Sequence, residues 1–380
     1  MRVLAPTLAL ICIVGGSSAV AAAPKPSGDA QLGSILKRAE QFRELQITDE
    51  DEQKIGAAVS ERVRQRYGVV QDAAVHRYVA LVGMVLAQVS TRPNLPWQFI
   101  VLDTDGVNAF AAPGGYIHVT RGALALMGSE AELAGVLGHE LIHVTEKHTL
   151  KAIQKGKLVQ MGANETMAGN AALFSRVVDK TTELVMAGFG RAEELEADRA
   201  GIRLADKVGY APVGLSTFLK DLLERNKTSN QKQGLFASHP EMQERLDKID
   251  RQIADEKLAS TATLEDRFKK TVPYQPVPIT KIAVVEAGSA GLAGGGKEDT
   301  SKGGDEKKDE DQPKKKGGFG LSSLLKPGGS EKKSAEVTGS AASRGVDSER
   351  NAKGGPVSKV VAVSLTPADI AAFKKAGNLK

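Results

Sequence analysis

The chain has 380 residues, of which 41% are hydrophobic, and carries a formal net charge of +5 with a pI near 9.0. This length suffices for one sizeable hydrophobic core or two smaller ones. The charge is mild and its signs are interspersed, whereas a nucleic-acid-binding protein usually carries a basic stripe with aromatic residues between the charges. No such stripe is present, so we expect no nucleic-acid partner.

The N-terminus has the three-part pattern of a secretory signal peptide. Arg2 supplies the positive start, an apolar run covers residues 3–14, and small residues follow up to Pro24. The run is too short to cross a bilayer as a helix, and no later segment is apolar enough to do so. We therefore predict a signal peptide over residues 1–22 and export, with the periplasm as the compartment. The single cysteine, Cys12, would leave with this segment, so no disulfide is expected.

Helical periodicity dominates the region that follows. Apolar residues recur at helical spacing over residues 35–45, 48–67 and 72–89. Thr48 suits the N-cap of the second of these helices, because three acidic residues follow it and interact favourably with the positive end of a helix.

A different pattern indicates strands in the next part of the chain. Residues 97–102 and 116–120 are rich in β-branched and aromatic side chains, as strands are. Turns are expected at residues 103–106 and at the sharp Pro-Gly-Gly turn of residues 113–115. A short helix is expected near residues 122–127.

A capping box then opens a long helix, because Ser129 and Glu132 form the Ser-x-x-Glu pattern. Gly135 and Gly138 would weaken an exposed helix. They are expected where another backbone or a bound chain approaches closely. Further helices are predicted over residues 171–187, 192–207, 212–223 and 240–257.

Composition changes towards the C-terminus. Gly, Lys, Ser, Glu and Asp dominate residues 286–358, which cannot bury enough apolar area to offset their chain entropy. We predict a low-complexity disordered linker there, preceded by an extended segment over residues 258–285 that packs on or leaves the core. Residues 359–380 are expected to form a short strand and a helix capped at Thr366. A cut near Gly294 is expected to leave the chemistry intact.

The pattern H-E-x-x-H occurs at residues 139–143. Helical positions four apart lie on one face, so His139 and His143 can reach a single ion, with Glu140 beside it. Imidazole nitrogens are good zinc ligands, and a catalytic zinc keeps one position open for water. The metal lowers the pKa of that water, and Glu140 can take its proton. The alternative is a helix with surface histidines, which its apolar neighbours disfavour.

A third ligand is expected from the acidic run near residue 194. Glu194 and Asp198 are four apart on a predicted helix, hence on one face. One carboxylate can bind the metal while the other accepts the N–H of a ligating histidine. A solvated acidic helix face is the alternative for this run alone.

Several ordered motifs together resemble peptidase family M48, most closely its soluble periplasmic members. The resemblance covers about residues 30–257, and we predict an M48-like peptidase domain over residues 28–257. The matching residues are Gly138 through His143 with His148, Gly190 and Arg191 through Arg199, and Ser238-His239-Pro240 with Arg245.

The resemblance implies an α+β fold, which is a mostly helical zincin-type domain with a small sheet beside the H-E-x-x-H helix. It implies that His139, His143 and Glu194 bind one Zn²⁺ per subunit and that Glu140 is the catalytic base. Asp198 would orient His139. The strand over residues 116–120 would form the sheet edge along which substrate lies.

Three further residues follow from the same resemblance. His239 is a candidate fourth ligand that can be displaced, or a donor to the oxyanion. Arg245 is a candidate for stabilising negative charge during the reaction. His148 does not share a face with both ligands and is left out of the metal site.

The function implied is a zinc-dependent endopeptidase that acts on unfolded or extended polypeptide, in misfolded or envelope proteins. The alternative is a zinc-stabilised periplasmic chaperone or assembly factor with little basal proteolysis, its site closed by His239. A shared envelope assembly partner is in doubt, because the tail differs from that of relatives with tetratricopeptide arrays. An exported structural protein with a coincidental motif would have no need of Glu140.

Overall fold

A computed structural model describes most of the central part of the chain and its C-terminus. All described residues belong to one unit, Ile47–Lys380. The signal peptide, the helix expected at residues 35–45 and most of the predicted linker lie outside the described residues. The described residues are 47–155, 171–227, 239, 242–278, 284–286, 334–336 and 357–380.

Two capped helices begin this unit, as predicted. In α2, Asp49–Tyr67, the Thr48 hydroxyl accepts from the Asp51 N–H, and the Asp51 carboxylate accepts from the Thr48 N–H. In α3, Ala73–Ala87, the Asp72 carboxylate caps the first turn. These side chains satisfy backbone donors that a helix cannot pair internally.

The sheet has three strands in the order β1-β3-β2, namely β1, Gln98–Leu102, β2, Ala109–Ala112, and β3, Tyr116–Thr120. β3 pairs with β2 in an antiparallel hairpin and with β1 in parallel. The prediction that β3 forms the sheet edge is therefore wrong. A hairpin is a local feature of the sequence, whereas the parallel return of β3 to β1 depends on packing that local patterns do not show.

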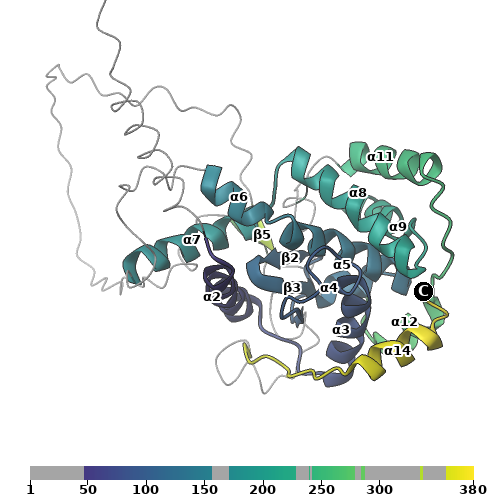
Figure 1. Ribbon diagram of the computed structural model, residues 1–380, viewed down its shortest axis with the longest axis horizontal. Coiled ribbons are helices and arrows are strands. Elements are labelled where there is room, and N and C mark those ends of the chain that lie inside the picture. Colours follow the sequence, from purple (N-terminus) through teal and green to yellow (C-terminus); the bar gives the residue numbers. More distant parts are fainter. Residues whose placement is uncertain are drawn as a thin grey trace, which may run out of the picture. The chain divides into compact units, whose positions relative to one another are not determined.

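The helix with the H-E-x-x-H pattern is α5, Glu130–Thr145, and every one of its residues is buried. Ser129 caps it, as predicted, and the short helix α4, Arg121–Leu126, precedes it. Figure 1 shows α5 in the middle of the fold, with α3, the sheet and later helices around it. A helix that is buried on all sides belongs in a core, so the helix with this pattern, polar side chains included, is also the central structural one.

Four more helices confirm the predicted pattern, and two of them, α8 and α9, pack directly on α5. A Cβ on Gly135 of α5 would lie 2.6 Å from the backbone N of Leu215, so this glycine admits a neighbouring helix, as expected. A further helix, α6, was not predicted. The five are α6, His148–Lys155, α7, Ala171–Ala187, α8, Arg191–Val208, α9, Gly214–Asn226, and α11, Met242–Asp255.

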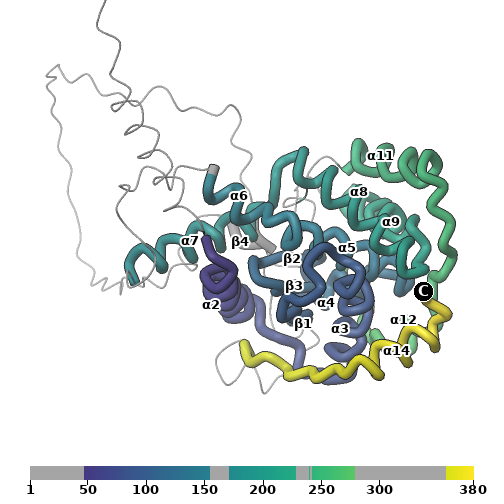
Figure 2. Tube along the Cα trace, viewed as in Figure 1, coloured from purple at the N-terminus to yellow at the C-terminus, as the bar shows by residue number. Residues whose placement is uncertain are grey.

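The C-terminal segment packs against the helices at the centre of the described unit. Its helix, α14, Pro367–Ala376, has the predicted Thr366 cap. The strand predicted before it is absent from residues 357–366. Instead, these residues are held by scattered bonds, such as the 2.7 Å bond from the Val69 N–H to the Val357 carbonyl. Figure 2 shows this yellow segment passing α3 and reaching α12.

The region expected to be extended, residues 258–285, contains a helix. This helix, α12, Glu265–Thr271, places Phe268 in the core, which explains why a turn of helix forms there. Farther along, β4, Val284–Glu286, pairs antiparallel with β5, Ser334–Glu336.

One buried carboxylate joins the C-terminal part to the start of α5. Glu130, fully buried, accepts 2.6 Å hydrogen bonds from the hydroxyls of Tyr78 and Tyr210 and a further pair from Arg267. The Arg267 guanidinium in turn lies 4.0 Å from the ring centroid of Phe373 in α14. Removal of α14 would uncover this group, so a cut near Gly294 is not neutral for the fold.

The mostly helical α+β fold class is confirmed. Among the helices of the described residues, none combines the length and the apolar character that crossing a bilayer requires.

Candidate metal centre

Two helices bring the candidate ligands together, because α5 carries His139 and His143 while α8 carries Glu194. Their backbones meet at glycines. A Cβ on Gly138 would lie 3.0 Å from the Gly201 carbonyl oxygen, and a Cβ on Gly201 would lie 2.8 Å from the His139 nitrogen. A larger residue at either position would push α8 away and withdraw Glu194 from the histidines. The expectation that Gly138 faces another backbone is confirmed.

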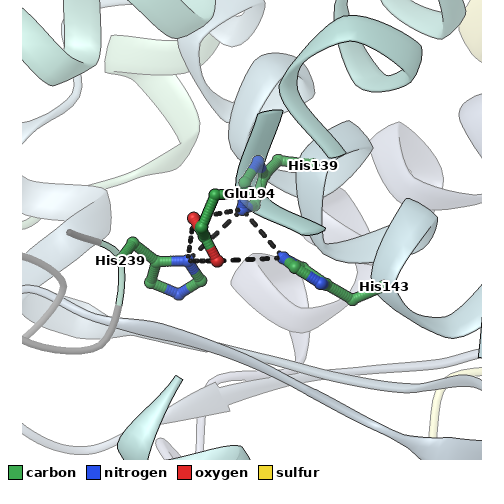
Figure 3. A group of neighbouring side chains, drawn as sticks. All are labelled: His139, His143, Glu194 and His239. Carbon is green, nitrogen blue, oxygen red and sulfur yellow. Dashed lines mark hydrogen bonds and ion pairs between the residues drawn. The ribbon is translucent and has the colours of Figure 1, made fainter. Parts of the chain in front are cut away.

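Four side chains form a tight, buried cluster: His139, His143, Glu194 and His239. One ligand atom from each lies within 4.8 Å of all the others. The two Nε2 atoms of His139 and His143 are 3.0 Å apart, and each is 3.5 Å from an oxygen of Glu194. In Figure 3 the four side chains converge on one region from α5, from α8 and from the segment that carries His239.

These spacings fit a metal ion. Ligands about 2.0–2.1 Å from a tetrahedral zinc lie roughly 3.3 Å from one another. The separations among His139, His143 and Glu194, 3.0 Å and 3.5 Å, bracket that value. Two imidazoles and a carboxylate are also the donor types that a catalytic zinc takes. The donor set is therefore suited to a divalent metal of this class.

Glu140 is buried without a hydrogen-bond donor. Its side chain is 1% exposed, and neither carboxylate oxygen has a hydrogen-bond partner among the described residues. Nε2 of His239 lies 3.7 Å from its Oε1. Burial raises the pKa of Glu140 above its usual value. A buried carboxylate left unpaired is costly, so its place beside a metal cluster calls for a functional explanation.

Asp198 holds His139, as the resemblance implied it would. Its Oδ1 lies 2.8 Å from Nδ1 of His139, and Arg245 donates two 2.7 Å bonds to the same carboxylate. Arg245 also lies 2.9 Å from Glu194 and is 2% exposed. The guanidinium is thus engaged by two carboxylates, an arrangement suited to holding them in place.

His143 has a different support, which the sequence did not indicate. Its Nδ1 lies 2.8 Å from Nδ1 of His148, and Nε2 of His148 lies 3.3 Å from Glu196. The ring of Phe189 stacks on His143 with centroids 4.1 Å apart. His148 is not one of the four clustered residues, but it touches His143, which is. The available signal was its position five residues after His143, at the start of the unpredicted helix α6.

His239 reaches the cluster from a segment of which little is described. Its Nδ1 lies 2.9 Å from Glu194 and 3.3 Å from Nε2 of His139. It is 3% exposed. Residues 228–238 and 240–241 on either side lie outside the described residues, as does most of the polar loop expected at residues 227–233.

The charged groups of the cluster shift one another's pKa values. Burial opposes the charged form of His139, but Asp198 and Glu194 outweigh burial and raise its pKa to about 9. Burial and the charge on His139 hold the pKa of His143 well below its usual value. Burial opposes the charged form of Glu194 too, but His239 and His139 keep its pKa well below the ordinary range. A metal ion that binds here must therefore displace a proton from His139.

Comparison with known proteins matches residues 73–253 to the model of "Peptidase family M48". All the residues of the buried cluster fall within this range.

Three curated relatives share this region. The chain is 28% identical over 207 residues to the Beta-barrel assembly-enhancing protease of Escherichia coli strain K12, a match to 51% of this chain and 42% of that protein. It is 32% identical over 171 residues to Metalloprotease LoiP of the same strain, covering 42% of this chain and 64% of that protein. It is 30% identical over 167 residues to Metalloprotease YcaL, covering 43% and 64%. The chain thus spans less than half the length of the first of these relatives.

Proposed function

We propose, from the match of residues 73–253 to the model of peptidase family M48, that this chain is a zinc-dependent endopeptidase. The observation that carries the proposal is the buried carboxylate of Glu140, which has no donor among the described residues and lies beside a buried cluster of ligand atoms. Metal binding alone does not need a carboxylate at this position, whereas general base catalysis does.

In this mechanism His139, His143 and Glu194 hold the metal, one ion per chain. Zinc, when bound, supplies a Lewis acid that polarises the peptide carbonyl and brings the pKa of water near neutrality. Glu140 accepts a proton from the attacking water and passes it to the departing amine. Asp198 keeps the N–H of His139 at Nδ1, which leaves Nε2 directed at the cluster.

The substrate is proposed to be an extended or unfolded polypeptide lying along β2. This strand is an edge of the sheet and packs against α5, where Glu140 lies. Its four residues are buried and α7 packs on it, so a bound peptide would have to displace α7. A peptide added to an edge strand is held by backbone hydrogen bonds with little demand on its side chains. Broad specificity of this kind suits misfolded proteins. The printed name of one relative, a beta-barrel assembly-enhancing protease, supports an envelope setting, and the signal-like N-terminus supports export to the periplasm.

His239 is proposed as a fourth ligand that can be displaced. Its distances to Glu194 and to His139 support this role. A ligand in that place would keep water away, so the resting enzyme would be weak. Replacement of His239 by Ala should then raise basal proteolysis and leave zinc content nearly intact. A fall in turnover of roughly 100-fold would instead assign His239 to the oxyanion.

The alternative, a zinc-stabilised chaperone or assembly factor, is favoured by the same closure of the site by His239. Cleavage of unfolded casein by the purified protein separates the two. We expect cleavage that 1,10-phenanthroline abolishes and added Zn²⁺ restores, with Glu140→Gln as the inactive control. If the wild type and His239→Ala bind zinc but leave casein intact, the peptidase proposal fails and the chaperone stands.

A further inference from the structure

The two metal histidines are held on their outer sides by different chemistry. His139 faces the carboxylate of Asp198 directly, at 2.8 Å. His143 faces another imidazole, that of His148, with the two Nδ1 atoms 2.8 Å apart. A carboxylate can only accept a hydrogen bond, so it fixes the tautomer of His139 by itself. An imidazole nitrogen can donate or accept, so His148 fixes nothing until its own tautomer is set.

Glu196 sets that tautomer. Its Oε2 lies 3.3 Å from Nε2 of His148, and an ionised carboxylate only accepts. The single hydrogen of neutral His148 therefore sits on Nε2, and its Nδ1 carries a lone pair. His143 must then donate from Nδ1, which leaves its own Nε2 without a hydrogen.

The alternative arrangement would disable the ligand. If His148 donated from Nδ1, His143 would carry its hydrogen on Nε2, the atom that lies 3.0 Å from Nε2 of His139 in the cluster. That atom would then have no lone pair for a metal. Phe189 stacks on the His143 ring at an interplanar angle of 14°, so the ring plane is also restrained. The contacts thus define both the plane and the tautomer of His143.

We propose that Glu196 and His148 form a relay that holds His143 in the Nδ1–H tautomer and so presents its Nε2 lone pair to the metal. His148 is a positioning residue, since it acts through His143 and reaches neither metal nor substrate. The relay depends on the proposed function in one respect only: the proposed function says that His143 binds a metal ion. The tautomer itself is a property of the metal-free protein.

Two substitutions at position 148 separate the relay from simple packing. The side-chain oxygen of Asn stands close to where Nδ1 of a histidine lies, so His148→Asn keeps an acceptor for His143. The amide of Gln reaches the place of Nε2 instead, so His148→Gln keeps a partner for Glu196 but leaves the Nδ1–H of His143 unpaired. The matched control is His76→Gln, because His76 is a buried histidine whose Nε2 bonds to the Val70 carbonyl, away from the cluster.

Zinc affinity of the full chain is measured by competition with a chromophoric chelator. Loss of an outer partner of a ligating histidine weakens metal binding about 10–100-fold. We expect a loss of this size in His148→Gln, near wild-type affinity in His148→Asn, and no change in His76→Gln. The zinc affinity of Glu196→Gln should lie between those of His148→Gln and His148→Asn, because the Gln amide can donate a hydrogen bond to His148 as well as accept one. Thermal unfolding of each variant checks that the fold is intact.

The second measurement reads the tautomer by two-bond ¹⁵N–¹H correlations of the histidines in the chelated protein. The relay predicts Nδ1–H for His143 in wild type and His148→Asn, and a mixture in His148→Gln. A wild-type His143 with its hydrogen on Nε2 overturns the relay, as does equal zinc affinity in the Asn and Gln variants. If the wild type takes up no zinc, the proposed function fails while the tautomer measurement still decides the relay.

Discussion

Two glutamates on α5, ten residues apart in sequence, are both buried and have opposite surroundings. Glu130 is fully buried and accepts hydrogen bonds from Tyr78, Tyr210 and Arg267. Glu140 is 1% exposed and accepts none from the described residues. A buried charge with its full set of donors stabilises a fold or leaves it neutral, whereas one without donors costs free energy. The comparison separates a carboxylate with a structural role from one for which we propose a chemical role.

The same substitution at each glutamate tests this contrast, and the larger effect is expected at Glu140. Glu140→Gln keeps the shape but removes the base, so turnover of unfolded casein should fall about 10²–10⁴-fold. The melting temperature should stay level or rise, because a buried unpaired charge is lost. Zinc content should match the wild type. Retained turnover would show that Glu140 is not the base.

Glu130→Gln should have the opposite effect, which is a loss of stability with little change in turnover. It leaves Arg267 without its charged partner and weakens two tyrosine bonds, which is expected to lower the free energy of unfolding by roughly 3 kcal/mol or more. Denaturant unfolding measures this directly, and turnover of the protein that remains folded should be near wild type. If Glu130→Gln lost no more stability than Glu140→Gln, the proposed structural role of Glu130 would be wrong.

A smaller effect is expected where α14 covers the Glu130 group. Phe373 stacks over Arg267 and lies edge-on to Tyr78, with ring centroids 6.0 Å apart. Phe373→Ala removes a half-buried ring and should cost about 2 kcal/mol. Lys375→Ala, at an exposed position of the same helix, is the control and should leave the free energy of unfolding unchanged. Equal stability of the two variants would mean that α14 does not support the core.

A further effect, confined to high pH, is a loss of stability as pH rises. Burial, and then the charge of Glu130, raise the pKa values of Tyr78 and Tyr210 above the ordinary value of 10.0. A raised folded pKa gives stability that is complete below the unfolded value and is lost as pH rises above it. Above about pH 10, each such tyrosine lowers the free energy of unfolding by about 1.4 kcal/mol per pH unit.

Tyr78→Phe isolates one of these tyrosines. At pH 7 the variant should be less stable than wild type by about 1.5–3 kcal/mol, because a hydrogen bond to a charged group is lost. Above pH 10 the difference should shrink by about 1.4 kcal/mol per pH unit. Urea titrations of both proteins from pH 7 to 11 measure this difference. If the stabilities of wild type and variant fell in parallel with pH, Tyr78 would not resist ionisation.

Local signals in the sequence were enough for much of the fold. The caps at Thr48, Ser129 and Thr366 each mark the start of an observed helix, because capping depends on residues within one turn. The place of β3 in the middle of the sheet was missed, since it depends on parallel pairing with β1, a contact distant in sequence. The docking of α14 was missed for the same reason.

The candidate site shows the same limit. Helical spacing brought His139 and His143 to one face, and two acidic residues four apart identified the stretch that meets them. His148 was set aside because it is off that face. The chain turns back before it, through the left-handed conformation of Lys147 at φ 55°, and so returns His148 to His143. A backbone reversal of this kind at a non-glycine residue leaves little trace in the sequence. The chemical roles assigned to these residues remain predictions.

Zinc stoichiometry tests the central claim most directly. The purified full chain, dialysed against Zn²⁺ and then against buffer, is measured by inductively coupled plasma mass spectrometry beside a variant with His139→Ala and His143→Ala. We predict one zinc per wild-type chain, the count for a site with three protein ligands and one open position, and essentially none in the double variant. A wild type without zinc, or a double variant that keeps it, would contradict the assignment of this cluster as the metal centre.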